Sequence, residues 1–240
     1  LISGDTRTSY CERRNLSLQE RLRLMLDVCA AVGHAHTKGV IHRDLKPGNI
    51  LVTEIDDVPV PKVIDFGIAR ITAPQNSDTP RVTQQNQFLG TAAYMSPEQL
   101  GLVDGDPDTR SDIYSLGVIL YQLVCGALPY ERPDDGRVSP QLLCNRMAAS
   151  EPKPPSSVVT AQDRSRATTG ESSVRELDWL ILKCLKHEPE HRYATCKDLS
   201  ADLDRFLQGH PLEAGPPGAV YRARKFVRRN RSTVAFGGVL

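Results

Sequence analysis

The 240-residue chain is 40% hydrophobic and 25% charged, which is enough for one sizeable core, although its length alone would also permit two small domains. The formal net charge is +1, but the last basic residues form a cluster that contains no acid, so residues 1–220 are mildly acidic. A nucleic acid is therefore not expected as the substrate. The basic cluster consists of Arg222, Arg224, Lys225, Arg228, Arg229 and Arg231.

The six cysteines are scattered and form no Cys-x-x-Cys pair, so we expect reduced thiols in a cytosolic setting rather than a zinc site. The chain begins at Leu1 instead of methionine and shows no succession of charged, apolar and small residues typical of a signal peptide. We therefore expect it to be a piece of a longer protein.

A capping box at Ser17 and Glu20 predicts the start of a helix. Gly39 marks its end. His34 and His36 fall in the last turns, where packing or compensation of the helix dipole is expected rather than metal binding. The expected buried face consists of Leu18, Leu22, Met25, Leu26, Cys29 and Val32.

Two short β-rich runs, 50–52 and 62–64, flank a proline-containing connection over 53–61, which predicts an antiparallel hairpin with a lengthened loop. Asn49 precedes the first run and Asp65 follows the second. Because antiparallel pairing places the start of one strand beside the end of its partner, both oxygen-bearing side chains should meet at one end of the hairpin.

Further along the chain, residues 68–98 are polar and irregular, and we interpret them as a regulatory segment. A helix is expected to begin at Asp112 and to stop at Gly126, with apolar residues on nearly all its faces, so it should lie in the middle of a domain. Residues 150–173 predict a surface loop. Helical patterns return at 177–185 and from Thr195 to Leu207.

Five ordered motifs resemble one family. Residues 42–49 read HRDLKPGN, 65–67 read DFG, 90–98 contain GT and YMSPE, 111–117 read SDIYSLG, and Arg192 follows. Together they are similar to the larger, C-terminal lobe of eukaryotic-type protein kinases, over about residues 1–207, and most like bacterial receptor-like Ser/Thr kinases. The implied fold class is mainly α with small β hairpins, a protein-kinase-like C-terminal lobe with the small N-terminal lobe absent from the chain.

By that resemblance Asp44 orients or accepts the proton of the substrate hydroxyl, and Lys46 neutralises charge on the phosphoryl group in flight. Asn49 and Asp65 would hold Mg²⁺ against the phosphates of ATP. Leu51 would form part of the floor under adenine. The resemblance thus implies ATP and Mg²⁺ as cofactors and a protein as the substrate.

Lys46, together with Gly90 and Thr91, resembles serine/threonine rather than tyrosine kinases, so the acceptor should be a serine or threonine hydroxyl. Arg43 before the catalytic aspartate resembles kinases that are switched by phosphorylation of the activation segment. The candidate acceptors in that segment, in order of preference, are Thr83, Thr79 and Thr72.

Other positions carry structural or regulatory roles by the same resemblance. Glu98 and Arg192 would form a buried ion pair, and Asp112 would accept hydrogen bonds from the backbone of the catalytic loop. His42 and Phe66 would belong to an internal apolar stack that aligns the lobes. Gly67 completes the DFG motif.

The implied organisation is the end of the interlobe hinge at 1–4, the kinase C-terminal lobe at 5–209, a basic juxtamembrane segment at 210–231 and the start of a transmembrane helix at 232–240. The expected location is a cytoplasmic kinase domain anchored to the cell membrane by a single-pass helix. Homodimerisation is a possible route of activation.

The 240 residues contain no glycine-rich phosphate loop and no nucleotide-clamping lysine on a preceding strand, so the chain alone is expected to be inactive. Two alternatives stay open beside an active protein kinase. One is a pseudokinase that serves as a binding scaffold, and the other is a small-molecule phosphotransferase with a similar loop.

Overall fold

A computed structural model describes residues 5–66, 91–130, 140–158, 171–216 and 218–229 of the chain. Most of these residues are helical, and one small antiparallel sheet has the strand order β1-β2-β3. The strands are β1 (Asp5–Thr6), β2 (Ile50–Ile55) and β3 (Val58–Val63). The helices are α1 (Arg7–Arg13), α2 (Leu18–Thr37), η1 (Pro47–Asn49), α4 (Thr109–Cys125), α5 (Pro140–Ala149), α6 (Pro155–Val158), α8 (Glu171–Cys184), η3 (Pro189–His191), α9 (Cys196–Leu207) and α10 (Ala219–Arg229).

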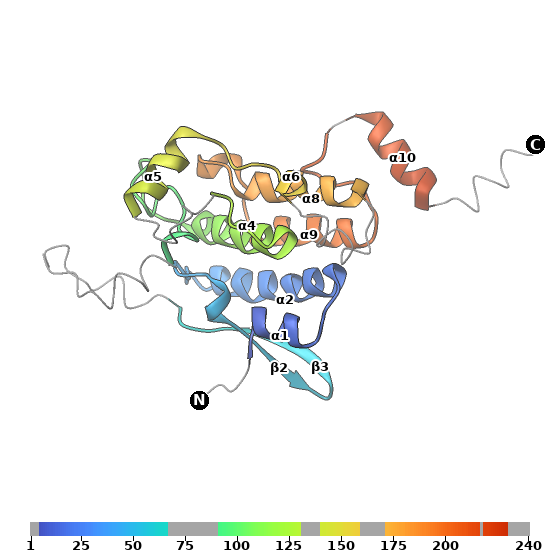
Figure 1. Ribbon diagram of the computed structural model, residues 1–240, viewed down its shortest axis with the longest axis horizontal. Coiled ribbons are helices and arrows are strands. Elements are labelled where there is room, and N and C mark those ends of the chain that lie inside the picture. The colour runs from blue at the N-terminus through green and yellow to red at the C-terminus, as the bar shows by residue number, and fades with distance from the viewer. Residues whose placement is uncertain (1–4, 67–90, 131–139, 159–170, 217, 230–240) are drawn as a thin grey trace, which may run out of the picture.

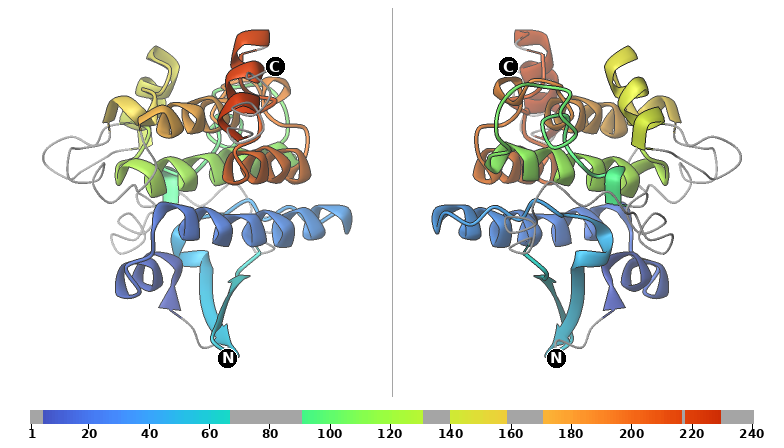
Figure 2. Two further views of the ribbon diagram at one scale, coloured as in Figure 1. Left: turned by 90° about the vertical axis from the view of Figure 1, so that its right-hand side faces the viewer. Right: turned by 90° about the vertical axis from the view of Figure 1, so that its left-hand side faces the viewer.

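The elements stack in layers on the long helix α2 (Figure 1). The sheet and α1 lie on one side of α2, and α4 and α9 lie on its other side, with α8 beyond them. Figure 2 shows the same order from two further directions, with α10 at the end of the molecule opposite the sheet. The main hydrophobic core therefore lies between α2, α4, α8 and α9.

Helix α2 begins where its capping box predicts. The hydroxyl of Ser17 accepts from the backbone N–H of Glu20, and the Glu20 carboxylate accepts from the backbone N–H of Ser17. Gly39 follows the helix with a φ of 74°, a conformation that suits glycine. The predicted buried face is confirmed, except that Leu26 is only partly buried, and Leu24 and Val28 are buried as well.

The hairpin differs from the sequence prediction in its turn. The strands are longer than expected, and the connection is the two-residue turn Asp56-Asp57 instead of a loop over 53–61. Both aspartates have positive φ, as a type I′ turn requires. The prolines that suggested a loop, Pro59 and Pro61, are tolerated because β3 is an edge strand and they lie opposite Glu54 and Val52, at positions that form no ladder hydrogen bond.

Helix α4 is the central helix, as predicted. It is buried on nearly all faces and ends at Gly126, which has a φ of 72°. Its first residue is Thr109, and Asp108 caps it by accepting from the backbone N–H of Arg110, so the helix starts three residues before Asp112. Asp112 consequently lies inside the first turn, where its side chain is fully buried.

Four α-helices were not predicted from the sequence: α1, α5, the four-residue α6, which falls in the segment predicted as a loop, and α10, which falls in the predicted basic juxtamembrane segment. Helices α1 and α6 are too short to show a clear helical period. The hydroxyl and the backbone N–H of Ser156 donate to Asp178 of α8, which ties α6 to the core. The later helices α8 and α9 are confirmed, and Thr195 and Asp198 form a capping box at the start of α9.

The residues after α9 fold back onto the helices. The buried carboxylate of Asp202 accepts from the backbone N–H groups of Glu213 and Ala214, at 2.7 and 2.9 Å. It also accepts from the hydroxyl of Tyr193. The segment 210–216 is thereby fixed against α9, and α10 follows it directly. No helix within the described ranges is both long and apolar enough to cross a membrane.

Candidate active site

The loop from Ile41 to Asn49 is held in place by one buried side chain of α4. Asp112 accepts from the backbone N–H of His42 through Oδ2 and from the backbone N–H of Arg43 through Oδ1, both at 2.8 Å. The ring of His36, at the end of α2, approaches the same Oδ2 at 2.7 Å. The carboxylate thus joins two helices and the loop, and an ionised carboxylate makes such hydrogen bonds strong.

His42 is fully buried, and its hydrogen bonds define one tautomer. The backbone N–H of Asp44 donates to Nδ1, at 3.3 Å, so Nδ1 is the acceptor and Nε2 carries the proton that reaches the carbonyl of Ile64, at 2.9 Å. The imidazole also lies 4.7 Å from the ring of Phe66. It therefore links the loop to the chain that leaves β3.

The side chains of Asp44, Lys46 and Asn49 are in mutual contact. Lys46 Nζ donates to Asp44 Oδ2 and to the hydroxyl of Thr91, both at 3.0 Å. Asn49 Nδ2 donates to the backbone carbonyl of Asp44 at 2.8 Å and to Oδ2 at 3.3 Å. The other carboxylate oxygen, Asp44 Oδ1, is buried and has no hydrogen-bond partner in the described part of the chain.

Asn49 and Asp65 lie at the same end of the hairpin. The backbone N–H of Ile64 donates to the carbonyl of Asn49 at 2.9 Å, which continues the β2–β3 ladder by one further pair. Asp65 follows directly, with a φ of 56° and an exposed side chain. Because the Asn49 amide nitrogen is engaged with Asp44, its oxygen is the atom left for a ligand. Amide and carboxylate oxygens are the donors that Mg²⁺ prefers, so the donor set fits that metal.

Arg43 has a strained backbone and an unsatisfied side chain. Its φ of 64° is in the left-handed region, and its carbonyl accepts from Gln99 Nε2 at 2.7 Å. Its buried Nε has no hydrogen-bond partner among the residues that the structure describes. The Arg43 side chain therefore has at least one N–H that is free to donate to a further group.

A second buried cluster lies around Glu98 and Arg192. The two side chains form a bidentate pair, with Nη1–Oε1 at 2.7 Å and Nη2–Oε2 at 2.8 Å, and both are almost fully buried. The guanidinium also donates to the carbonyls of Arg110, Lys186 and His187. Every part of the charge pair is thus hydrogen-bonded, as a buried ion pair requires.

Two opposing effects set the pKa of Glu98. Burial alone would raise the pKa, but hydrogen bonds from Arg192 and from the hydroxyl of Ser111 outweigh it, so the pKa lies below its ordinary value. Glu98 is therefore ionised at neutral pH, and it holds the segment before α4 to the segment before α9.

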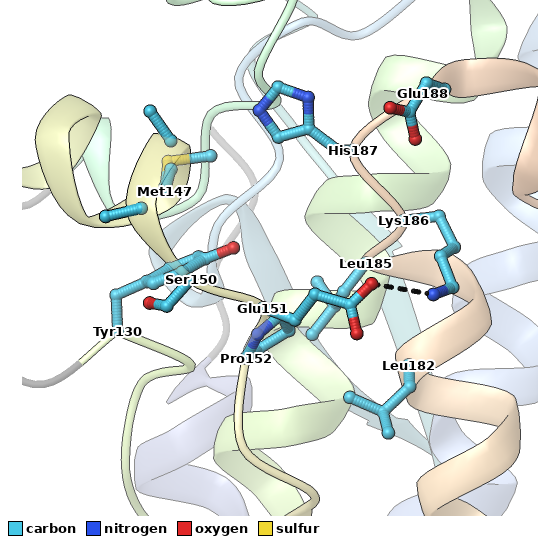
Figure 3. A pocket seen from close by; sticks show the side chains of 12 residues that line it. Tyr130, Met147, Ser150, Glu151, Pro152, Leu182, Leu185, Lys186, His187 and Glu188 are labelled. Carbon is cyan, nitrogen blue, oxygen red and sulfur yellow. Dashed lines mark hydrogen bonds and ion pairs between the residues drawn. The ribbon is translucent and has the colours of Figure 1, made fainter.

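A hollow of about 470 Å³ lies beside the segment that leads to Arg192 (Figure 3). Tyr130, Met147 and Glu151 line one side, and His187 faces them from the other. Lys186 Nζ and Glu151 Oε1 form an ion pair 3.0 Å apart at its edge. The hollow contains none of the predicted catalytic side chains, so it is distinct from the cluster around Asp44.

The structure brings most of the predicted residues into two clusters. The loop cluster contains His42, Arg43, Asp44, Lys46, Asn49, Phe66, Thr91 and Asp112, and the second contains Glu98 and Arg192. Leu51 lies in β2, and its side chain is half-buried. Gly67, Gly90, Thr72, Thr79 and Thr83 lie outside the described residues.

Three contributors were missed by the sequence analysis. His36 was expected to pack or to balance the dipole of its helix, but it contacts Asp112. Ser111 donates to Glu98, and Gln99 donates to the Arg43 carbonyl. Ser111 and Gln99 are adjacent to predicted motif residues, which is the signal that could have found them. His36 is 76 residues from Asp112 and gives no such signal.

Known proteins resemble this chain in sequence and in fold. A family model described as "Protein kinase domain" matches residues 2–202. The chain belongs to the protein kinase family. Crystal structures of the PknI kinase domain from Mycobacterium tuberculosis are also similar. One of them, of a double mutant, has a TM-score of 0.56 and 22% identity over 86% of this chain and 63% of that one, which shows the fold.

Curated relatives include bacterial proteins named as serine/threonine-protein kinases. The chain is 38% identical over 197 residues to "Serine/threonine-protein kinase PknB" of Mycobacterium leprae, covering 82% of this chain and 28% of the relative. It is 37% identical over 187 residues to "Probable serine/threonine-protein kinase PknB" of Corynebacterium glutamicum, covering 78% and 26%. The chain thus spans about a quarter of the length of these relatives.

Proposed function

We propose that the protein containing this chain transfers a phosphoryl group from ATP to serine or threonine hydroxyls of protein substrates. The observation that carries the proposal is the hydrogen bonding of the Asp44 carboxylate. Lys46 and Asn49 hold one of its oxygens, while the other, Oδ1, is buried without a partner among the described residues. An acceptor hydroxyl would supply the missing donor.

In this proposal Asp44 Oδ1 accepts the hydrogen bond of the substrate hydroxyl, aims its oxygen at the γ-phosphorus and receives its proton. Lys46, poised between Asp44 and Thr91, stabilises negative charge on the transferred group. Asp112 and His42 act as positioning residues, because they fix the backbone on which Asp44 stands. Leu51 would contribute to the floor under adenine.

ATP and Mg²⁺ are the proposed cofactors. Asn49, through its amide oxygen, and Asp65 would hold the metal, and the metal would neutralise the phosphates of the nucleotide. The pairing of Ile64 with Asn49 supports this assignment, because it places both residues at one end of the hairpin. Phe66 and His42 would form part of the internal stack that orders this end.

Phosphorylation of the segment before Thr91 would complete the site. The unsatisfied Nε of Arg43 is the group that would meet the new phosphate. The proposed acceptors remain Thr83, then Thr79 and Thr72. The buried pair of Glu98 and Arg192 would anchor the far end of the same segment against the helices.

We further propose that the 240 residues alone bind ATP weakly and transfer phosphate negligibly. The sequence supplies no glycine-rich loop and no clamping lysine, and these groups provide a large part of phosphate binding in the family. The described lobe would thus be the C-terminal lobe of a two-lobed enzyme. Titration of the chain with a fluorescent ATP analogue tests this, since micromolar affinity would contradict it.

We also propose where the protein is located and how it assembles. The kinase domain would be cytoplasmic and anchored by a single-pass helix that begins in residues 232–240, which lie outside the described residues. Homodimerisation would favour activation. Charged residues within about ten positions downstream of Leu240 would exclude the span.

The decisive experiment incubates the complete protein with Mg²⁺ and ATP, beside an Asp44→Asn variant, and locates phosphorylated residues by mass spectrometry. We expect phosphoserine or phosphothreonine on protein in the first sample and a decrease of about 10³-fold or more in the second. ATP binding without transfer would indicate a pseudokinase. Transfer only to small molecules would indicate a phosphotransferase of that kind.

A further inference from the structure

Helix α10 is docked on α8 through one face. The rings of Tyr221 and Trp179 meet edge to face, with centroids 5.3 Å apart, and the Tyr221 hydroxyl accepts from the backbone N–H of Leu212 at 3.3 Å. One turn further on, Lys225 Nζ lies 2.5 Å from Glu176 Oε2, and only 11% and 10% of these two side chains are exposed. The helix is therefore fixed at two points along one face.

The opposite face of α10 carries exposed apolar side chains. Val220 is 82% exposed and Val227 is 46% exposed. These residues are seven apart, two helical turns, so they share one face. At about 100° per residue that face lies roughly 130° around the axis from Tyr221 and Lys225. Ala223, between them on the same side, is also exposed.

All the charged residues of α10 are basic. Its eleven residues include Arg222, Arg224, Lys225, Arg228 and Arg229 and no acid. Lys225 is paired with Glu176, and Arg222 is exposed. In the described parts of the chain, no other helix combines this excess of basic residues with exposed valines.

We propose that α10, while docked on α8, lies on the surface of an anionic lipid bilayer. A basic helix with an outward apolar stripe is suited to the boundary between headgroups and acyl chains, where the valines enter the apolar region and the net positive charge of the helix is attracted to the anionic surface. A nucleic acid would use the arginines but would leave the valines in water, so the apolar stripe favours the bilayer.

The proposal depends neither on kinase activity nor on a membrane span. It concerns side chains of α10 that are already exposed, and α10 lies at the opposite end of the molecule from the sheet (Figure 2). Residues 232–240 are identical in all the variants below, so a contribution from a span would be the same in each of them.

The test is co-sedimentation of the 240-residue chain with phosphatidylcholine vesicles that contain about 30% phosphatidylserine, compared with phosphatidylcholine alone. We expect binding to the anionic vesicles at about 0.1 M salt and release at about 0.5 M. Val220→Asp combined with Val227→Asp should weaken binding about tenfold or more. Arg222 lies about 150° around the axis from the valines, so Arg222→Gln should weaken binding less than the paired valine change does.

Val58→Asp is the matched control, because Val58 is 59% exposed but lies in β3 at the other end of the molecule. It should bind like the parent chain. Circular dichroism should show the same helix content in every variant. Equal binding by the Val220/Val227 variant, equal binding to neutral vesicles, or binding to an RNA oligonucleotide without vesicle binding would each overturn the proposal.

Trp179 is the only tryptophan of the chain and lies under Tyr221, so its emission reports whether α10 stays docked. We expect no shift of the emission maximum when anionic vesicles are added. Tyr221→Ala provides the reference for the undocked helix and should shift the emission to longer wavelength. The same red shift on vesicle binding by the parent chain would contradict the docked arrangement.

Discussion

A single carboxylate, Asp112, determines the geometry of the candidate catalytic loop. It accepts three hydrogen bonds, from the ring of His36 and from the backbone of His42 and Arg43, while completely buried. The resemblance to protein kinases implied the contacts with the backbone of the loop. The contact with His36 could not be predicted, because it depends on the packing of the end of α2 against the start of α4.

Replacement of Asp112 by Asn should disrupt this arrangement, because the amide nitrogen cannot accept a hydrogen bond from the backbone N–H that it would face. We expect a loss of about 3 kcal/mol in the free energy of unfolding. Urea titration measures this loss, and hydrogen exchange should show faster exchange of the amides of His42 and Arg43.

The matched control for this change is Asp108→Asn, which makes the same substitution at the N-cap of the same helix. Asn is as good an N-cap as Asp, so the change should cost about 0.5 kcal/mol or less. Equal losses at positions 108 and 112 would contradict the role of Asp112 in holding the loop.

The buried pair of Glu98 and Arg192 predicts a specific pH dependence. The folded-state pKa of Glu98 is lowered, so the stabilisation is present above the ordinary value of 4.5 and is lost as pH falls through the lower folded pKa. Glu98→Gln should cost about 3 kcal/mol near pH 7, because Arg192 stays buried without its counter-charge. The difference from the parent chain should shrink as pH falls below about 4.5.

Urea titrations of both proteins at a series of pH values measure that difference. Glu188→Gln is the control, because Glu188 belongs to an exposed pair with His191, and it should change stability little at any pH. A difference between parent and Glu98→Gln that is independent of pH would show that Glu98 is not the group that titrates.

At the scale of elements, the sequence predicted the helix ends that depend on residues close together in the chain. The capping boxes of α2 and α9 and the glycine after α4 involve residues within a few positions of one another, so their signals are complete in the sequence. The hairpin was predicted correctly, but the prediction of its turn was wrong, because Pro59 and Pro61 normally indicate a loop. Their tolerance depends on β3 being an edge strand, which only the assembled sheet reveals.

The turn of the hairpin offers a stabilising substitution. Asp57 has a φ of 62°, which costs energy for any residue with a Cβ, and glycine is preferred there in type I′ turns. Asp57→Gly should therefore raise the free energy of unfolding by about 0.5–1 kcal/mol, measured by urea titration.

Asp104→Gly is the control for the turn, because Asp104 is also an exposed loop aspartate but has no positive φ. There the added freedom of the unfolded chain should lower stability by about 0.5–1 kcal/mol. Changes of the same sign at positions 57 and 104 would show that backbone strain at the turn is not the cause.

At the scale of the whole molecule, all six cysteines lie in the described residues as free thiols, distributed over several elements. Their burial could not be assigned one by one from the sequence, because it depends on how the helices pack. Five are buried, and burial raises the pKa of Cys29, Cys184 and Cys196, which lie on three different helices of one core.

Thiol reactivity should report this packing. Cys144, on α5, is only partly buried, so it alone should react quickly with Ellman's reagent in the folded protein. The other thiols should react only after unfolding in urea. Cys144→Ser should abolish the fast phase, and a fast phase that persists in this variant would show that the core is open to solvent.

The hydrogen bonds of Asp202 bear on where an expression clone of this protein should end. The family match stops at this residue, yet the donors for its carboxylate come from Glu213 and Ala214, and Arg205 approaches it at 2.9 Å. A stop codon placed at the family boundary would delete these three partners and the C-terminal part of α9, and would leave the Tyr193 hydroxyl as the remaining described donor to this buried carboxylate. A clone that extends through Arg229 would retain them, together with the contact between Tyr221 and Trp179.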